Sequence, residues 1–282
     1  MVQVKALACE LPATLGIPLS RWSCRELADH VRRSGLVASI GHTTVWRWLD
    51  EDAIRPWYHR SWIFPRDPHF ALKAGRILDL YHRIWKGRPL KQDEFVLCAD
   101  EKTSIQARAR CHPTLPPQPG SPAKVEHEYQ RLGKWAYLAA WDVHAARLFG
   151  RCEPQTGIVP FARLVDQVMR QPPYRHARRV FWIVDNGSSH QGLTSIERMQ
   201  CKYPHALLVH GPVHASWLNQ IEIYFSIIQR KVLTPNDFPS LSVLAQRLSD
   251  FERHYEQKAR PFQWKFTRQD LHALLERLDK AA

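Results

Sequence analysis

A short apolar run that ends in an acid most constrains what this chain can fold into. Residues 179–185 read RVFWIVD, and Asn186-Gly187 follows directly. Five apolar residues in a row, most of them large, are typical of a strand that is buried on both faces. A buried strand holds its last residue rigidly, and the Asn-Gly turn leaves the carboxylate of Asp185 uncovered. The run therefore predicts a sheet with a binding site at its edge.

The chain after residue 93 alternates between strand-like and helix-like patterns. The predicted strands cover residues 94–100, 134–142, 147–153, 179–185 and 206–210. The predicted helices cover residues 157–171, 193–203, 216–233, 241–255 and 268–278. Three successive strands followed by alternating helices and strands indicate an α/β domain with a mixed sheet. In such open sheets, ligands bind outside the carboxyl ends of the strands.

Two further acids complete a candidate site. The predicted strand 94–100 also ends in an acid, Asp100. Glu222 lies beside the apolar stripe of helix 216–233, where an acid is costly unless it is paired or binds a metal. Asn219 lies one turn earlier on the same face of that predicted helix. Three carboxylates without accompanying cysteines favour Mg²⁺ or Mn²⁺, and two such ions can activate a water or a 3′-hydroxyl for attack on a phosphodiester.

Each of these acids also has an ordinary structural interpretation. An aspartate at a strand end often belongs to a turn or caps a helix, and a glutamate on a helix is usually solvated. Asp142 also ends a predicted strand and competes with Asp100. A Ser-His-Asp hydrolase that uses His190 and one of the serines at 104, 188 or 189 is an alternative. The chain, however, has no G-x-S-x-G nucleophile elbow.

The composition limits the class of protein. Forty Lys and Arg residues against 27 acids give a formal charge of +13, which favours a nucleic acid partner over a basic enzyme without one. A hydrophobic content of 44% is typical of a chain with a large core. The six cysteines form no C-x-x-C pair, which fits reduced thiols in a cytosolic protein. Because the sequence shows no signal peptide and no apolar run of about 18 residues, we expect a cytoplasmic protein without a membrane partner.

Residues 20–50 have the pattern of a helix-turn-helix. Ser23 and Glu26 form a capping box, Gly35 breaks the first helix, and a second short helix follows over residues 42–49. The outward side chains of the second helix would meet base edges or phosphates. They are His42, Thr43, Trp46 and Arg47. An ordinary helical hairpin with a solvated basic face is the alternative.

The segments around the three acids resemble the catalytic blocks of IS630-type transposases in the Tc1/mariner superfamily. These segments are CADEKTSIQA (98–107), VDNGSSHQG (184–192) and HASWLNQIEIYFSIIQRKVL (214–233). The resemblance covers nearly the whole chain. It implies an α/β fold with an RNase H-like mixed-sheet catalytic domain, preceded by a small all-α helix-turn-helix domain.

The same resemblance implies roles for individual residues. It assigns Asp100, Asp185 and Glu222 as the catalytic triad and as ligands for two Mg²⁺ or Mn²⁺ ions. It removes Asp142 from the set of ligands. It also places His190 and Asn219 near the site, where they would support the ligands or contact the DNA. Lys102 follows the first aspartate closely, and we expect it to meet a phosphate.

The implied reaction is metal-dependent cleavage at the ends of an insertion element, followed by attack of the freed 3′-hydroxyl on target DNA. The implied partners are double-stranded DNA, with its terminal inverted repeats and target, and a second copy in a homodimer. A bacterial cytoplasmic protein, associated with the nucleoid when bound to DNA, is expected. The expected domains are 1–55 helix-turn-helix, 56–92 linker and connecting helix, 93–235 catalytic domain, and 236–282 C-terminal helices packing on it.

One feature departs from the family. Relatives usually begin with two helix-turn-helix units, and only one is evident here. Residues 2–16 look like the tail of a missing first unit. A truncated, transposition-incompetent copy that binds DNA and acts as an inhibitor is therefore an alternative function, and a structure-selective nuclease on the same fold is another. The presence of all three acids favours the enzyme, because a protein that only binds DNA does not need them.

Overall fold

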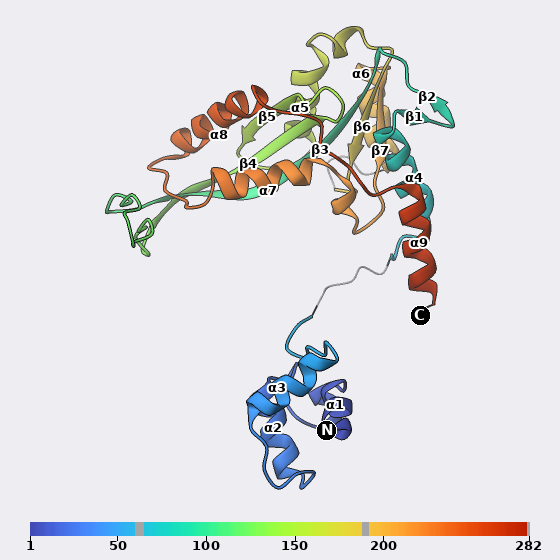
Figure 1. Ribbon diagram of the computed structural model, residues 1–282. Coiled ribbons are helices and arrows are strands. Elements are labelled where there is room, and N and C mark those ends of the chain that lie inside the picture. The colour runs from blue at the N-terminus through green and yellow to red at the C-terminus, as the bar shows by residue number, and fades with distance from the viewer. Residues whose placement is uncertain (60–64, 188–191, 281–282) are drawn as a thin grey trace. The chain divides into compact units, whose positions relative to one another are not determined.

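The computed structural model describes residues 1–59, 65–187 and 192–280, and the chain forms two compact units (Figure 1). The first unit is Met1–Ile63 and the second is Phe64–Ala282. In the described parts of the chain, no helix combines the length and the apolar character needed to cross a membrane.

The first unit is a three-helix cluster. Its helices are α1 (Val2–Ala8), α2 (Cys24–Arg33) and α3 (His42–Glu51), with a short 3-10 helix at Pro12–Leu15. The predicted capping box at Ser23 and Glu26 is confirmed. The predicted break is confirmed at Gly35, whose φ of +74° suits a residue without Cβ.

The segment 2–16, predicted to be the tail of a separate unit, belongs to this same core. Its residues Val4 and Ala8 are buried together with Leu27, Val31 and Val45 of α2 and α3. The apolar face of α1 therefore packs with α2 and α3 in the core of this unit.

The second unit is built on a mixed sheet of five strands in the order β5-β4-β3-β6-β7. The strands are β3 (Glu94–Ala109), β4 (Gln130–Asp142), β5 (Leu148–Glu153), β6 (Arg179–Val184) and β7 (Ala206–His210). β3, β4 and β5 are antiparallel neighbours, whereas β3, β6 and β7 are parallel. The predicted α/β class with a mixed sheet is confirmed.

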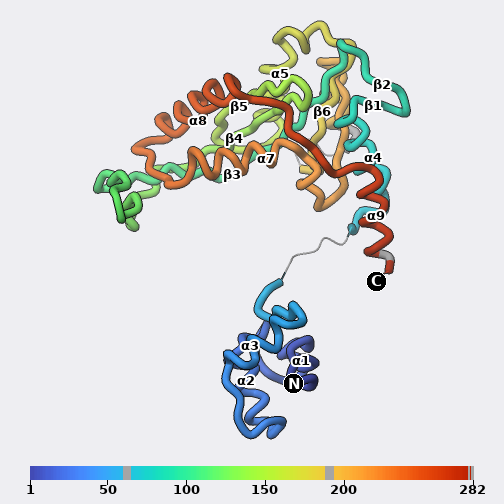
Figure 2. Tube along the Cα trace, in the orientation of Figure 1, coloured from blue at the N-terminus to red at the C-terminus, as the bar shows by residue number. Residues whose placement is uncertain are grey.

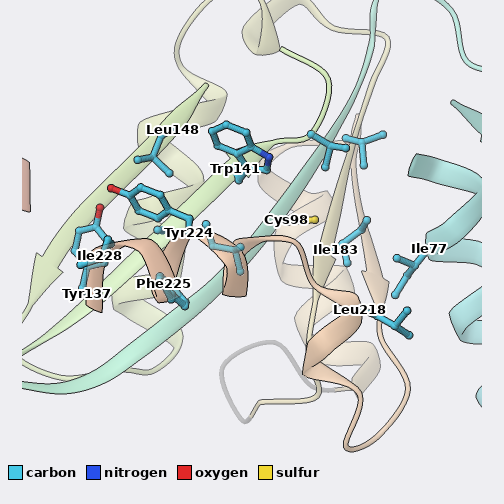
Figure 3. Close-up of a cluster of buried hydrophobic side chains, with 14 of the residues drawn as sticks. Ile77, Cys98, Tyr137, Trp141, Leu148, Ile183, Leu218, Tyr224, Phe225 and Ile228 are labelled. Atoms are coloured by element: carbon cyan, nitrogen blue, oxygen red, sulfur yellow. The ribbon is translucent and has the colours of Figure 1, made fainter. Parts of the chain in front are cut away.

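Helices cover both faces of this sheet (Figures 1 and 2). One face packs against α4 (Phe70–Tyr81), α7 (Ile221–Lys231) and α8 (Leu241–Glu256), and α9 (Arg268–Asp279) packs on α4. The other face packs against α5 (Ile158–Met169) and α6 (Gly192–Lys202). Alternate strand residues enter the two cores: Cys98 and Ile183 enter the core that contains α4 and α7, as Figure 3 shows, and Ala99 enters the core that contains α5 and α6.

Three predicted elements differ in their bounds. The strand predicted to end at Asp100 continues to Ala109, because pairing with β4 persists beyond the end of β6. The connecting helix predicted within residues 56–92 ends at Tyr81 as α4, and a small hairpin of β1 (Ile84–Trp85) and β2 (Arg88–Pro89) follows it. The predicted helix 216–233 is broken into a 3-10 helix at Ser216–Leu218 and α7.

The helix predicted to lie in the linker is part of the second unit. Ile77, Leu78 and Leu80 of α4 are fully buried in the core that also contains α7 and α8. The division between the two units falls at residues 63 and 64. This apolar face explains why α4 packs on the sheet instead of connecting two domains.

Candidate active site

Asp100 lies on β3, and Asp185 directly follows the neighbouring parallel strand β6 at an equivalent position. Cys98 of β3 pairs with Ile183 of β6, and each aspartate comes two residues later. Because side chains alternate along a strand, both aspartates have the parity of the residues that face α7. The side chain of Asp100 is buried at 8% exposure, and Asp185 is half-buried. The structure thus brings the two predicted aspartates to one edge of the sheet.

Glu222 lies in the first turn of α7, on the helix that packs against this face. Ile221 and Phe225 are buried under the helix, whereas Glu222 is half-buried. The predicted location of this acid at the boundary between core and solvent is confirmed. Its position at a helix start was not predicted, because the sequence pattern runs through the break at Asn219 without interruption.

Asn219 joins the start of α7 to β3. Its backbone is extended, so it lies in the break and not on a helix face as predicted. The side chain is 4% exposed, and its Nδ2 donates to the backbone carbonyl of Ala99 across 3.0 Å. Asn219 therefore fixes the distance between the residue before Asp100 and the helix that carries Glu222.

Tyr81 of α4 also holds this break between the 3-10 helix and α7. The sequence did not predict this role. Its hydroxyl donates to the backbone carbonyl of Leu218 and accepts the backbone N–H of Gln220 at 3.3 Å. The hydroxyl also lies 3.2 Å from the sulfur of Cys98. Tyr81 ends an apolar helix, and nothing in its sequence context separates it from an ordinary core aromatic residue.

The three acids interact electrostatically. Burial, and then the charges of Asp185 and Glu222, raise the pKa of Asp100 to about 7, against a lowering by the Glu101 amide that donates to it. Burial also raises the pKa of Glu222, and the positive charge of Lys102 opposes this shift. Lys102 therefore lies close enough to affect one predicted catalytic acid.

The arrangement suits a hard cation in its chemistry. The donors are carboxylate oxygens, which Mg²⁺ and Mn²⁺ prefer, and a cation would relieve the repulsion that raises the pKa of Asp100. Within residues 1–59, 65–187 and 192–280, however, no three His, Cys, Asp or Glu side chains lie close enough together to hold a metal ion. Asp100 accepts the Glu101 amide and Asp185 accepts the Gly187 amide at 2.7 Å each. The three acids thus interact and have the oxygen atoms that such a cation prefers, but they are not arranged as a complete set of metal ligands.

A pocket of roughly 350 Å³ opens beside Asp185. Its wall consists of the end of β6, the loop after β7 and Ile77 of α4. Asn186 fixes this wall, because its Nδ2 donates to the carbonyl of Gly211 across 2.8 Å. Asn219 also lines the pocket, so the space adjoins the candidate site.

The competing residues are placed elsewhere or outside the described chain. Asp142 has the parity of Ala140, which faces α5 and α6, and its buried carboxylate accepts the amides of His144 and Ala145 and the hydroxyl of Tyr174. It ends β4, and its side chain supports the following turn on the opposite face. His190 and residues 188–189 lie outside the described residues. The predicted position of His190 and the serine-hydrolase alternative therefore stay predictions.

In the first unit, α3 presents the predicted face. Val45 and Leu49 are fully buried, and the four predicted DNA-contacting residues are exposed. These residues are His42, Thr43, Trp46 and Arg47. Their exposure is confirmed, and their contact with DNA stays a prediction.

Comparison with known protein families identifies the chain. The family model described as DDE superfamily endonuclease matches residues 95–245, which is just over half of the chain. This protein belongs to that family. The matched segment contains all three predicted acids, and α4 with Tyr81 lies before it. A comparison with curated protein sequences gives no match.

Solved structures show the fold of this DDE superfamily endonuclease. The Mos1 mariner paired-end complex with Mn has 15% identity and a TM-score of 0.55, covering 100% of this chain and 77% of that one. The Mos1 paired-end complex with Mg has 13% identity and a TM-score of 0.53, covering 99% and 77%. The Mos1 strand transfer complex has 13% identity and a TM-score of 0.52, covering 99% and 76%. The predicted RNase H-like fold is thereby confirmed.

Proposed function

We propose that this DDE superfamily endonuclease is the transposase of an IS630-type insertion element, which cuts DNA at the element's ends and joins them to a target. The observation that carries the proposal is the placement of Asp100 and Asp185 at one strand register, with Glu222 at the start of the helix on the same face. Family membership and the mariner-like fold support it.

In this proposal Asp100, Asp185 and Glu222 would hold Mg²⁺ or Mn²⁺, with two ions per site. The bound ions would supply an activated water or 3′-hydroxyl and stabilise the leaving oxygen of the phosphodiester. Asp100 must lose its proton to serve, which its pKa of about 7 permits near neutral pH. Asn219 would keep Glu222 at a fixed distance from β3, and the pocket beside Asp185 would hold part of the DNA.

The proposed partners are double-stranded DNA and a second copy of the chain. The excess of positive charge favours a polyanion, and α3 presents an exposed basic and aromatic face. The similar solved structures include Mos1 complexes described as paired-end, with a left transposon end, and as a strand transfer complex. By analogy we propose binding to terminal inverted repeats and to target DNA by a homodimer.

The deciding experiment is cleavage of a supercoiled plasmid that carries the inverted repeats flanking the gene, with Mg²⁺ or Mn²⁺. We expect the wild type to cut at the repeats and Asp185→Asn to be inactive, with DNA binding within a few-fold. Asp250→Asn, which removes an exposed carboxylate on α8, is the matched control and should cut normally.

Other outcomes have distinct meanings. If Asp185→Asn cuts as well as the wild type, the assignment of the three acids is wrong. If the wild type binds the repeats without cutting, the protein acts as the inhibitor considered above. Cutting at branched structures without regard to the repeats would identify a structure-selective nuclease.

A further inference from the structure

A second, polar pocket lies where β3 leaves the sheet. It has a volume of roughly 240 Å³, and its wall is formed by residues 102–106 and Arg108 of β3, by Gln229 of α7, and by Leu233 and Asn236. Beyond this point β3 and β4 continue as a two-stranded ribbon, which extends past α7 and α8 in Figure 2. The pocket is separate from the one beside Asp185, since the two share no lining residue.

The backbone of this pocket is irregular and held in place. The pairing of β3 with β4 shifts register between Lys102 and Ile105, and Ser104 between them has a φ of +55°. Such a bulge re-aims the side chains around it. Asn236 fixes the far wall, because its side chain accepts the Arg108 amide at 3.1 Å and donates to the Gln106 carbonyl at 2.8 Å.

Two positively charged side chains line the pocket, and neither has an acidic ion-pair partner among the described residues. Neither Lys102 nor Arg108 forms a salt bridge within the described parts of the chain. The guanidinium of Arg108 stacks on the ring of Tyr129, 4.4 Å from its centroid. Its Nε is buried without a hydrogen-bond partner. A buried unsatisfied donor in a hollow with two positive charges points to an anionic ligand.

The position of the pocket relates it to the candidate active site. Lys102 lies two residues after Asp100 on β3. Glu222 and Gln229 lie on the same helix, seven residues apart, which is about 10 Å at a rise of ~1.5 Å per residue. One DNA strand carries a negative charge about every 3.4 Å along the axis. A strand that follows α7 from the acids would therefore bring one of its phosphates to this pocket within a few nucleotides.

We propose that this pocket is a subsite for a backbone phosphate of the DNA strand, held by Lys102 and Arg108 within a few nucleotides of the scissile phosphate. This inference rests on the proposed function for the identity of the DNA and deepens it by assigning where the strand runs. The ligand is the phosphodiester anion, because two cationic side chains line the pocket and little of its surface is apolar.

The test measures DNA binding by the full chain in an Asp185→Asn background, so that no DNA is cut. The probe is a mixed-sequence duplex of about 40 base pairs, titrated over a range of salt concentrations. We expect Lys102→Gln and Arg108→Gln each to reduce the salt slope by about 1, the value for one lost phosphate contact. Arg108→Lys should retain the slope, because it retains the charge.

The matched control is Arg175→Gln, which removes an exposed arginine next to Tyr174 of the opposite core. Circular dichroism melts establish that each variant is folded. The proposal is overturned if both pocket variants keep the wild-type slope, or if Arg175→Gln lowers it equally. The proposal is also overturned if a pocket variant keeps the wild-type salt slope but changes the molar mass measured by light scattering. That result would show that the pocket binds a second copy of the chain. Because binding needs no cleavage, an inactive wild type leaves this result interpretable.

Discussion

The side-chain amide of Asn219 donates to the backbone carbonyl of Ala99, the residue directly before Asp100, across 3.0 Å. Asn219 also comes just before the first turn of α7, which carries Glu222. One buried hydrogen bond therefore ties the strand of one predicted catalytic acid to the helix of another. The two acids are far apart in the sequence, and this bond limits how far they can separate.

Replacing Asn219 with Ala should reduce cleavage more than it reduces folding. The change leaves the Ala99 carbonyl without its donor, and a buried unsatisfied group costs about 1–3 kcal/mol. We expect a loss of cleavage rate of at least tenfold and a higher Mn²⁺ concentration for half-maximal activity. Urea unfolding gives the stability change. A variant that loses stability but cleaves normally would show that the bond only supports the fold.

Tyr81→Phe tests the second support of the same break. The variant removes the hydroxyl that bonds Leu218 and Gln220 but keeps the buried ring. We expect kcat to fall with little change in KM, because α7 would start less rigidly while the DNA surface stays intact. Tyr203→Phe is the control, since it removes a hydroxyl that donates to Asp166 on the opposite face. Equal losses in both variants would contradict a positioning role for Tyr81.

The sequence predicts the parts of this site that depend on local patterns. The apolar run before Asp185 and the capping box at Ser23 each carry their signal within a few residues, and both are confirmed. Asp142 and Asp100 lie on opposite faces of the sheet because of the register in which β3 and β4 pair. A sequence does not reveal that register.

Other parts depend on contacts between distant segments. The continuation of β3 to Ala109 is hidden, because residues 101–109 are largely polar and gain their strand structure by pairing with β4. The break at Asn219 is hidden because apolar residues keep a helical spacing on both sides of it. The bond from Tyr81 spans more than 130 residues, so no local pattern could indicate it.

The protonation of Asp100 should make stability depend on pH. Burial and the neighbouring acids raise its pKa from 3.8 to about 7 in the folded state, so the folded state holds this proton more tightly than the unfolded chain. The charged carboxylate therefore lowers stability progressively as pH rises from about 4 to about 7. Asp100→Asn should be more stable than the wild type at pH 8, by at most about 4 kcal/mol at ~1.4 kcal/mol per pKa unit.

The measurement is urea unfolding of both proteins at pH 4.5 and pH 8 without divalent cations. The difference between them should fall to about 1 kcal/mol at pH 4.5, because the unfolded carboxyl, with a pKa of 3.8, is already mostly ionised there. Burial also raises the pKa of Glu252 to about 7, but Glu252 is present in both proteins, so its effect cancels in the difference. Adding Mn²⁺ at pH 8 should stabilise the wild type more than the variant. A difference that is the same at both pH values would contradict this account.

Gly150→Ala should destabilise the second unit. A Cβ at this position would lie 2.1 Å from the hydroxyl of Tyr137 and 2.2 Å from Oε1 of Glu252. These two atoms share a 2.7 Å hydrogen bond that links β4 to α8, so the added methyl group must displace the two side chains and disrupt this link. We expect a loss of about 1–3 kcal/mol in the free energy of unfolding.

Gly211→Ala is the matched control for that change. Its Cβ would approach only to 3.6 Å from the Val184 carbonyl, an ordinary contact. Hydrogen exchange of the α8 amides should increase in Gly150→Ala and stay unchanged in the control. Equal stability of the two variants would show that α8 accommodates the methyl group without moving.

Arg47→Ala tests the first unit without disturbing its core. Arg47 is exposed on α3, and the buried residues of that helix are Val45 and Leu49. Surface changes of this kind usually alter stability by less than about 0.5 kcal/mol, so a loss of DNA binding would report a lost contact. We expect weaker binding to the inverted repeats and a salt slope lower by about 1. The control is Arg25→Ala, which removes another exposed arginine, on α2. If both variants weaken binding equally, the first unit attracts DNA by its net charge, and the helix-turn-helix prediction for α3 is wrong.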